Sequence, residues 1–146
     1  MSSNGRVKMT KNPVKVKRRG YSAERRLTLL LSRKRGNYVF RVPVSGSRAP
    51  RKISTAFPDV FLVNNIEDRI VAFEVKSTSK KKVKVKREQI VKLLRFLEPF
   101  KKYSRREAVV AVWFSREGKW VFKQIKDKLE IGDVVVLTEE ESSWKP

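Results

Sequence analysis

The sequence predicts a single α/β domain in which helices flank a mixed β-sheet. The chain has 146 residues, a length typical of one domain. Helical and strand patterns alternate in the order α-β-β-β-α-β-β, with one extra strand late in the chain. Two of the strand patterns are apolar at nearly every position, so we expect both faces of the sheet to be covered.

The first helix is expected to begin at Ser22, a candidate N-cap, and to stop near Gly36. Its predicted buried face consists of Ala23, Leu27, Leu30 and Leu31. A strand is expected at residues 38–42. Residues 43–57 are rich in Ser, Gly, Pro and basic residues, which predicts a long loop of the kind that is usually functional or disordered.

Two further strands are expected at residues 59–63 and 69–75, around a turn at 64–68. A second helix is expected at residues 88–100, where apolar residues recur at helical spacing. The remaining predicted strands are residues 108–114, 120–125 and 134–138.

The chain is strongly basic, with 36 lysines and arginines against 15 acidic residues. Residues 1–19 hold seven of the basic residues and no acid, which predicts a disordered basic arm. Residues 20–146, the predicted single domain, keep 29 basic and 15 acidic residues, a net charge of +14. Such an excess is typical of nucleic-acid binding, because neutralising phosphates releases counterions.

Two residue types are missing from the sequence, which contains no cysteine and no histidine. Their absence excludes zinc fingers, thiol nucleophiles, Ser-His-Asp triads and imidazole acid-base chemistry. Catalysis would have to use carboxylates, lysines, hydroxyls and metal-bound water. No apolar run approaches the ~20 residues of a membrane span, and we expect a soluble cytoplasmic protein associated with the nucleoid and not with a membrane.

Two carboxylates, Asp59 and Glu74, lie near the ends of apolar strands, where burying a charge is costly. A hairpin axis between Ile66 and Glu67 would place Asp59 directly opposite Glu74. Lys76 would then share a face with Glu74, because side chains alternate along a strand. Carboxylates this close repel each other, and a divalent cation with oxygen ligands relieves the repulsion.

A structural explanation of the same residues stays open at this point. Glu74 and Lys76 would form an ordinary ion pair, and Asp59 would cap a turn after Pro58. The five-residue connection between the two strands allows more than one register.

At these positions the sequence is similar to a known motif. Pro58-Asp59 followed by Glu74-Val75-Lys76 resembles the PD-(D/E)XK motif of the restriction-endonuclease-like nucleases. The segments that extend the resemblance are Gly20-Tyr21-Ser22-Ala23-Glu24, Val44-Ser45-Gly46-Ser47 and Val83-Lys84-Val85-Lys86 with Gln89. In order and spacing, residues 20–114 resemble an archaeal Holliday-junction resolvase of the Hjc/Hje type, with residues 84–100 most similar to Hje.

The resemblance implies a restriction-endonuclease-like fold and a homodimer that resolves four-way DNA junctions during recombination and repair. It implies two symmetric nicks made with Mg²⁺, for which Mn²⁺ would substitute. Glu24, Asp59 and Glu74 would surround the metal, Lys76 would support the attacking water or the transition state, and Ser45 would supply a catalytic hydroxyl. Accessory partners, such as a sliding clamp, stay open.

Some of these assignments have structural alternatives. Glu24 also fits a first-turn glutamate favoured by the helix dipole, and Ser45 fits a turn beside Gly46. Gln89 either contacts the active site or is a surface helix residue. Candidates for a dimer face are Trp113, Trp120 and residues 90–100, although a core position is favoured for Trp113.

Basic clusters flank the predicted site on both sides. One cluster follows the strand that carries Glu74 and consists of Lys80, Lys81, Lys82, Lys84, Lys86 and Arg87. The other lies in the long loop and consists of Arg48, Arg51 and Lys52. Few acids are present to neutralise them, so we expect contacts with phosphates, which position DNA without reading bases.

Two other functions remain open from the sequence. A nuclease with the same site would cut ordinary duplexes, flaps or mismatches. A non-catalytic basic protein would bind DNA through the same surface, although it would have no need for Asp59, Glu74 and Lys76 together.

Overall fold

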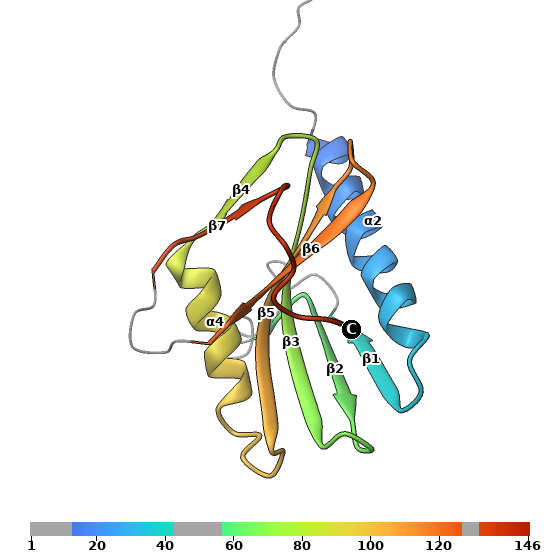
Figure 1. Cartoon of the computed structure of the whole chain (residues 1–146), viewed down its shortest axis with the longest axis vertical. Helices are drawn as coiled ribbons and strands as arrows, with labels where there is room; N and C mark the ends of the chain where they lie inside the picture. The colour runs from blue at the N-terminus through green and yellow to red at the C-terminus, as the bar shows by residue number, and fades with distance from the viewer. Residues whose placement is uncertain (1–12, 43–56, 127–131) are drawn as a thin grey trace, which may run out of the picture.

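A computed structural model describes residues 13–42, 57–126 and 132–146 of the chain (Figure 1). The elements in chain order are α2 (Pro13–Ser32), β1 (Asn37–Arg41), β2 (Val60–Asn64), β3 (Arg69–Thr78), β4 (Lys82–Val85), α4 (Arg87–Leu97), β5 (Arg105–Phe114), β6 (Lys119–Ile125) and β7 (Val134–Leu137). This is the predicted order with one further strand, β4. None of the helices in these ranges is long and apolar enough to cross a membrane.

The main sheet has five strands in the order β1-β2-β3-β5-β6. Strands β3 and β5 are parallel, and the other neighbours are antiparallel, so the predicted mixed sheet is confirmed. Strands β4 and β7 form a separate antiparallel pair.

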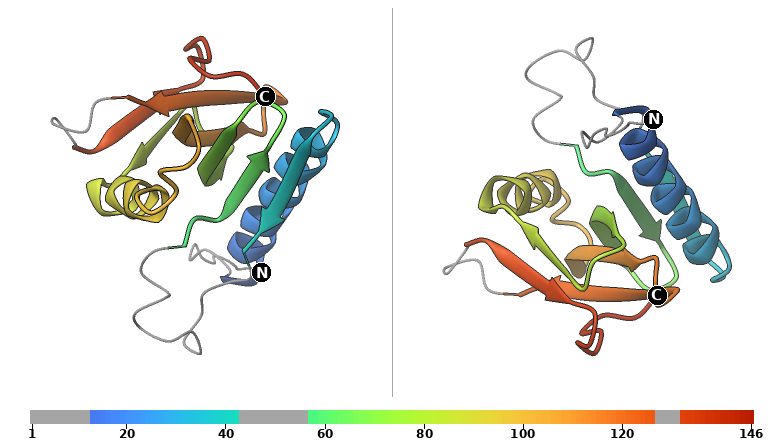
Figure 2. Two further views of the ribbon diagram at one scale, coloured as in Figure 1. Left: turned by 90° about the horizontal axis from the view of Figure 1, so that it is seen from below. Right: turned by 90° about the horizontal axis from the view of Figure 1, so that it is seen from above.

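Helices α2 and α4 lie on opposite faces of the main sheet (Figure 2). Side chains of β3 alternate between them, as expected for a strand. Val71 and Phe73 pack in the cluster that contains Leu27 of α2, whereas Ile70 packs in the cluster that contains Leu93 of α4. The predicted burial of both sheet faces is therefore confirmed.

The prediction for the start of the first helix is wrong. The helix begins at Pro13, so Ser22 lies inside it and is no N-cap, and residues 13–19 belong to it and not to a disordered arm. Proline suits the first turn of a helix, and lysine and arginine are good helix formers that carry no apolar pattern. Residues 1–12 lie outside the described residues. The chain turns into β1 at Gly36, whose φ is +88°.

Strand β4 is missing from the sequence prediction, which treated its residues only as part of a basic stretch. Its valines alternate with lysines over four residues, too short a pattern to stand out. Val85 is fully buried and packs with Val136 of β7 and Val110 of β5. The basic strand is thereby fixed to the sheet that carries the predicted site.

The last described residues return to the α2 side of the sheet. Trp144 packs edge-on against Phe73 and Phe122, with ring centroids 5.2 and 5.3 Å apart. Its Nε1 donates to Glu107 Oε1 at 3.0 Å, and the buried Arg69 donates through Nε to the same oxygen at 2.7 Å. These contacts close the core near the first residues of β3 and β5.

Candidate active site

The pairing of β2 with β3 places Asp59 beside β3. Val60 pairs with Phe73, which confirms the predicted register, and the ladder ends at Val60. One residue further, the Asp59 N–H donates to the Phe73 carbonyl at 3.2 Å, and Asp59 Oδ2 accepts the Val75 N–H at 2.9 Å. The Asp59 carboxylate thus lies just before the first residue of β2, beside the part of β3 that extends beyond the β2–β3 ladder.

Glu74 lies on the α4 side of β3 and is only 3% exposed. Its Oε2 accepts a hydrogen bond from Gln89 Nε2 on α4 at 3.0 Å, and Lys76 Nζ lies 3.4 Å from the same oxygen. Oε1 is buried and has no hydrogen-bond partner among the described residues. Glu74 therefore has one oxygen held by the protein and one oxygen without a donor.

The positive charges near Glu74 only partly offset the cost of burying its carboxylate. Burial, and to a lesser extent the nearby charge of Asp59, raise the pKa of Glu74, whereas the positive charges of Lys76 and Lys92 lower it in part, and the net pKa is about 7. A buried ionised carboxylate is stable only when it is paired. A cation at Oε1 would add positive charge on the side of the carboxylate that has no partner among the described residues.

Glu24 approaches the site from α2, on the other side of the sheet. Arg41 Nε donates to its Oε1 at 3.1 Å. Burial raises the pKa of Glu24 above its ordinary value, the hydrogen bond from Arg41 lowers it in part, and the Asp59 charge raises it. Asp59 thus acts electrostatically on both glutamates.

The three carboxylates do not form one compact ligand set. Across the described parts of the chain, no group of three or more His, Cys, Asp or Glu side chains is close enough to hold a metal ion. Asp59 and Glu74 fit a hard divalent cation, because both offer carboxylate oxygens and one buried oxygen lacks a partner. Glu24 is turned towards Arg41, and its role as a third ligand stays a prediction.

Of the predicted DNA-contact residues, those that follow β3 can be located. They lie around β4 and are exposed: Lys80, Lys81, Lys82, Lys84, Lys86 and Arg87. Lys84 forms an exposed ion pair with Asp133, with Nζ and Oδ2 3.4 Å apart, and such pairs are weak. The predicted site residues of the long loop, Ser45, Arg48, Arg51 and Lys52, lie outside the described residues.

Sequence reasoning did not identify two basic residues that act on the glutamates. Arg41 ends β1 and binds Glu24 across 17 residues of sequence. Lys92 follows Gln89 by three residues on α4 and acts on the pKa of Glu74. The spacing between Gln89 and Lys92 places them on one helix face, but only the packing of α4 on β3 shows what that face meets.

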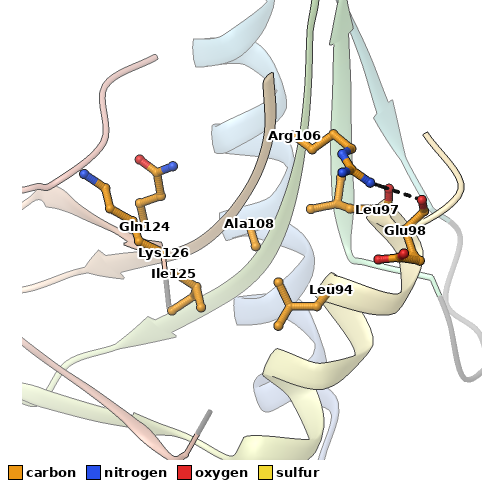
Figure 3. A pocket seen from close by; sticks show the side chains of 8 residues that line it. All are labelled: Leu94, Leu97, Glu98, Arg106, Ala108, Gln124, Ile125 and Lys126. Atoms are coloured by element: carbon orange, nitrogen blue, oxygen red, sulfur yellow. Dashed lines mark hydrogen bonds between the residues drawn. The ribbon is translucent and has the colours of Figure 1, made fainter. Parts of the chain in front are cut away.

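A cavity of about 180 Å³ lies elsewhere on the molecule (Figure 3). It is lined by Leu94, Leu97, Glu98, Arg106, Ala108, Gln124, Ile125 and Lys126. Arg106 Nη1 donates across it to the carbonyl of Glu98 at 3.1 Å, and neither Asp59 nor Glu74 takes part. The candidate active site is thus separate from this cavity.

Comparison with known proteins identifies the family. The family model described as archaeal Holliday junction resolvase (Hjc) matches residues 15–143. The crossover junction endodeoxyribonuclease Hje of Sulfolobus acidocaldarius is 38% identical over 112 residues, which cover 77% of this chain and 73% of that protein. The enzyme of the same name from Saccharolobus islandicus is 36% identical over 101 residues, which cover 69% of this chain and 67% of the relative.

A solved structure is similar in fold. Hjc of Archaeoglobus fulgidus, a Holliday junction resolvase, matches with a TM-score of 0.58 over 81% of this chain and 83% of its own, at 20% identity. The predicted α/β fold of the restriction-endonuclease-like type is therefore confirmed. The chain belongs to the archaeal Holliday-junction resolvase family.

The raised pKa of Glu74 predicts that the metal-free protein loses stability as pH rises. The folded state keeps the proton of Glu74 up to about pH 7, whereas the unfolded state releases it near 4.5, so the unfolded state binds fewer protons between these values. In EDTA, urea unfolding should show the free energy of unfolding falling by roughly 2 to 3 kcal/mol from pH 5 to 8 because of this group. Glu74→Gln removes the titration and should flatten that part of the profile. Identical slopes in the two proteins would contradict the assignment.

Proposed function

We propose that the protein resolves four-way DNA junctions by two symmetric, metal-dependent cuts in the phosphodiester backbone. Membership of the resolvase family supports the reaction and the substrate. The metal requirement rests on one observation: the buried Glu74 has an oxygen without a donor and lies beside Asp59. Mg²⁺ is the proposed ion, with Mn²⁺ as a substitute, because both favour oxygen ligands.

In this proposal Asp59 and Glu74 hold the cation, and Glu24 joins them by giving up its bond to Arg41. Bound there, a divalent cation supplies positive charge for the phosphate and favours ionisation of a water molecule. Asp59 is already fixed by its hydrogen bond with the Val75 N–H. Glu74 is fixed by burial and by the contacts to its Oε2.

Lys76 is proposed as the residue that supports the attacking water. Its Nζ lies 3.4 Å from Glu74 Oε2, and about a third of its side chain is exposed to solvent. The ammonium group can therefore donate to a water molecule or offset the charge that develops on the phosphate in the transition state. Ser45 is proposed as a further catalytic hydroxyl on the family resemblance alone.

The exposed lysines around β4 are proposed to hold the DNA backbone. They continue directly from the strand that carries Glu74 and Lys76, so a phosphate chain along β4 would lead to the carboxylates. Contacts of this kind position DNA without reading bases, which suits a substrate that is defined by its geometry. Arg48, Arg51 and Lys52 are proposed to act in the same way.

A homodimer is proposed because the molecule exposes an aromatic surface. This aromatic face comprises the exposed Tyr38 and Phe40, the half-buried Phe57, Phe61 and Phe100, and the buried Phe96, against which the last three pack. Tyr38 is 64% exposed and Phe40 is 47% exposed. Phe40 stacks on Phe61 with ring centroids 4.8 Å apart, and Phe61 contacts Phe96 of α4 at 5.0 Å. An exposed apolar patch often marks an interaction site, and a twofold axis would present two equivalent active sites to one junction.

The aromatic face includes part of the predicted dimer candidates but not all of them. Phe96 and Phe100 come from the predicted range of residues 90–100. Trp113 and Trp120 instead pack against the core on the α2 side, with ring centroids 5.4 Å apart, and Arg26 lies 4.2 Å from the Trp113 ring centre. The sliding clamp stays a prediction without a supporting contact among the described residues.

Cleavage of a labelled synthetic four-way junction tests the function. Wild-type protein with Mg²⁺ should introduce paired symmetric nicks and leave a linear duplex of equal size intact. Asp59→Asn keeps the size of the side chain but weakens the cation site, so the cleavage rate should fall roughly a thousandfold while junction binding persists.

The matched control is Glu117→Asn, which removes an exposed carboxylate from the β5–β6 turn and should leave cleavage unchanged. Binding without cleavage by the wild-type protein would favour a non-catalytic DNA-binding protein. Equal cutting of junction and duplex would indicate a general nuclease with the same fold.

Substitution of Phe40 tests the homodimer. Phe40→Glu places a charge on the exposed part of the aromatic face, and burying an unpaired charge is costly, so the dimer dissociation constant should rise at least tenfold by sedimentation velocity. Leu29→Glu is the control, because Leu29 is 59% exposed on α2, away from this face. Equal dissociation constants for the two variants would exclude this face as the interface.

A further inference from the structure

We propose that Gln89 is a positioning residue that fixes the orientation of Glu74 and thereby leaves Oε1 free to bind the divalent cation. The inference rests on the proposed metal site and adds a residue of α4 to it. Gln89 would not touch the substrate or the cation in this arrangement. It would act through the Glu74 carboxylate.

The contacts of Glu74 are divided unequally between its two oxygens. Gln89 Nε2 donates to Oε2 at 3.0 Å, and Lys76 Nζ lies 3.4 Å from the same atom. Oε1 is buried but has no hydrogen-bond partner among the described residues. The terminal torsion of a glutamate is soft, so without the Gln89 amide the carboxylate could rotate and share Lys76 between both oxygens.

The position of Gln89 does not depend on its own hydrogen bond. Its neighbours Ile90 and Leu93 are buried and fix α4 on the sheet. The Arg87 N–H at the start of α4 donates to Asp133 Oδ1 at 2.8 Å. Loss of the Gln89 amide should therefore change the orientation of Glu74 without unfolding the helix.

A residue that hydrogen-bonds to a metal-binding side chain and fixes its orientation influences the affinity for the metal. Removal of such a partner typically costs ten- to a hundredfold in affinity or activity. A glutamine that only satisfied a buried carboxylate would affect folding stability and leave metal affinity unchanged. Metal binding therefore separates a positioning role from a purely structural one.

The test is calorimetric titration of Mg²⁺ into the full chain without DNA, together with the Mg²⁺ concentration for half-maximal junction cleavage. Gln89→Met keeps the length of the side chain but removes the donor. The Mg²⁺ dissociation constant and the Mg²⁺ concentration for half-maximal cleavage should both rise at least tenfold. The affinity for the junction in EDTA should stay within twofold of wild type. Gln124→Met is the control, because it makes the same change on β6, two strands away from Glu74 in the sheet.

The outcomes distinguish this inference from the function on which it rests. Wild-type Mg²⁺ binding that Asp59→Asn removes, but that Gln89→Met leaves within twofold, would overturn the role of Gln89 and leave the metal site intact. A Gln89→Met protein in which only the thermal unfolding midpoint in EDTA is lowered would overturn that role as well. A wild-type protein that binds no Mg²⁺ at these carboxylates would overturn both proposals.

Discussion

The site depends on the burial of one carboxylate, Glu74, in the middle of the central strand. Glu74 lies just beyond the β2–β3 ladder, but β5 pairs with this part of β3 and α4 packs over it, so the side chain is only 3% exposed and water has little access to its charge. The protein offsets the cost of desolvation at Oε2 through Gln89 and Lys76 and leaves Oε1 without a donor. An arrangement of this kind is unfavourable for stability, and the proposed cation would account for its persistence.

Unequal strand lengths bring the other groups to Glu74. β2 has five residues and β3 has ten, so β3 extends beyond Val60, the first residue of β2. Asp59 occupies that step and takes the next N–H of β3, while the exposed end of β3 carries Lys76 towards solvent and leads to the basic residues of β4. The same geometry thus places a carboxylate, a lysine and the proposed phosphate-binding surface one after another.

Helix α4 connects the active site with the aromatic face. Its first turn carries Gln89, which holds Glu74, and its last turns carry Phe96, which contacts Phe61. The buried residues Ile90 and Leu93 between them make the helix one rigid unit on the sheet. A second copy docked on the aromatic face would therefore contact α4, the helix whose Gln89 is proposed to orient Glu74.

Local rules of strand geometry were sufficient to predict part of the site. The connection between β2 and β3 allows more than one register, and the structure has the one with its axis between Ile66 and Glu67. The alternation of side chains along β3 then places Lys76 beside Glu74. The pairing of Glu24 with Arg41 joins a helix and a strand, and the contact of Gln89 depends on how α4 crosses β3. Such contacts arise from packing between elements and leave no periodic signal in the sequence. The start of α2 was missed for a different reason, since four of residues 13–19 are lysine or arginine, which are good helix formers but give no apolar pattern.

The most direct test of the proposed metal site is the location of a cation in crystals of the protein soaked in Mn²⁺, read from anomalous scattering. We expect an anomalous peak beside Glu74 Oε1 and the Asp59 carboxylate, absent from crystals of Asp59→Asn. The site would be contradicted by anomalous peaks that lie only elsewhere, or by a map in which Glu74 Oε1 is hydrogen-bonded to a protein donor while Mn²⁺ is present.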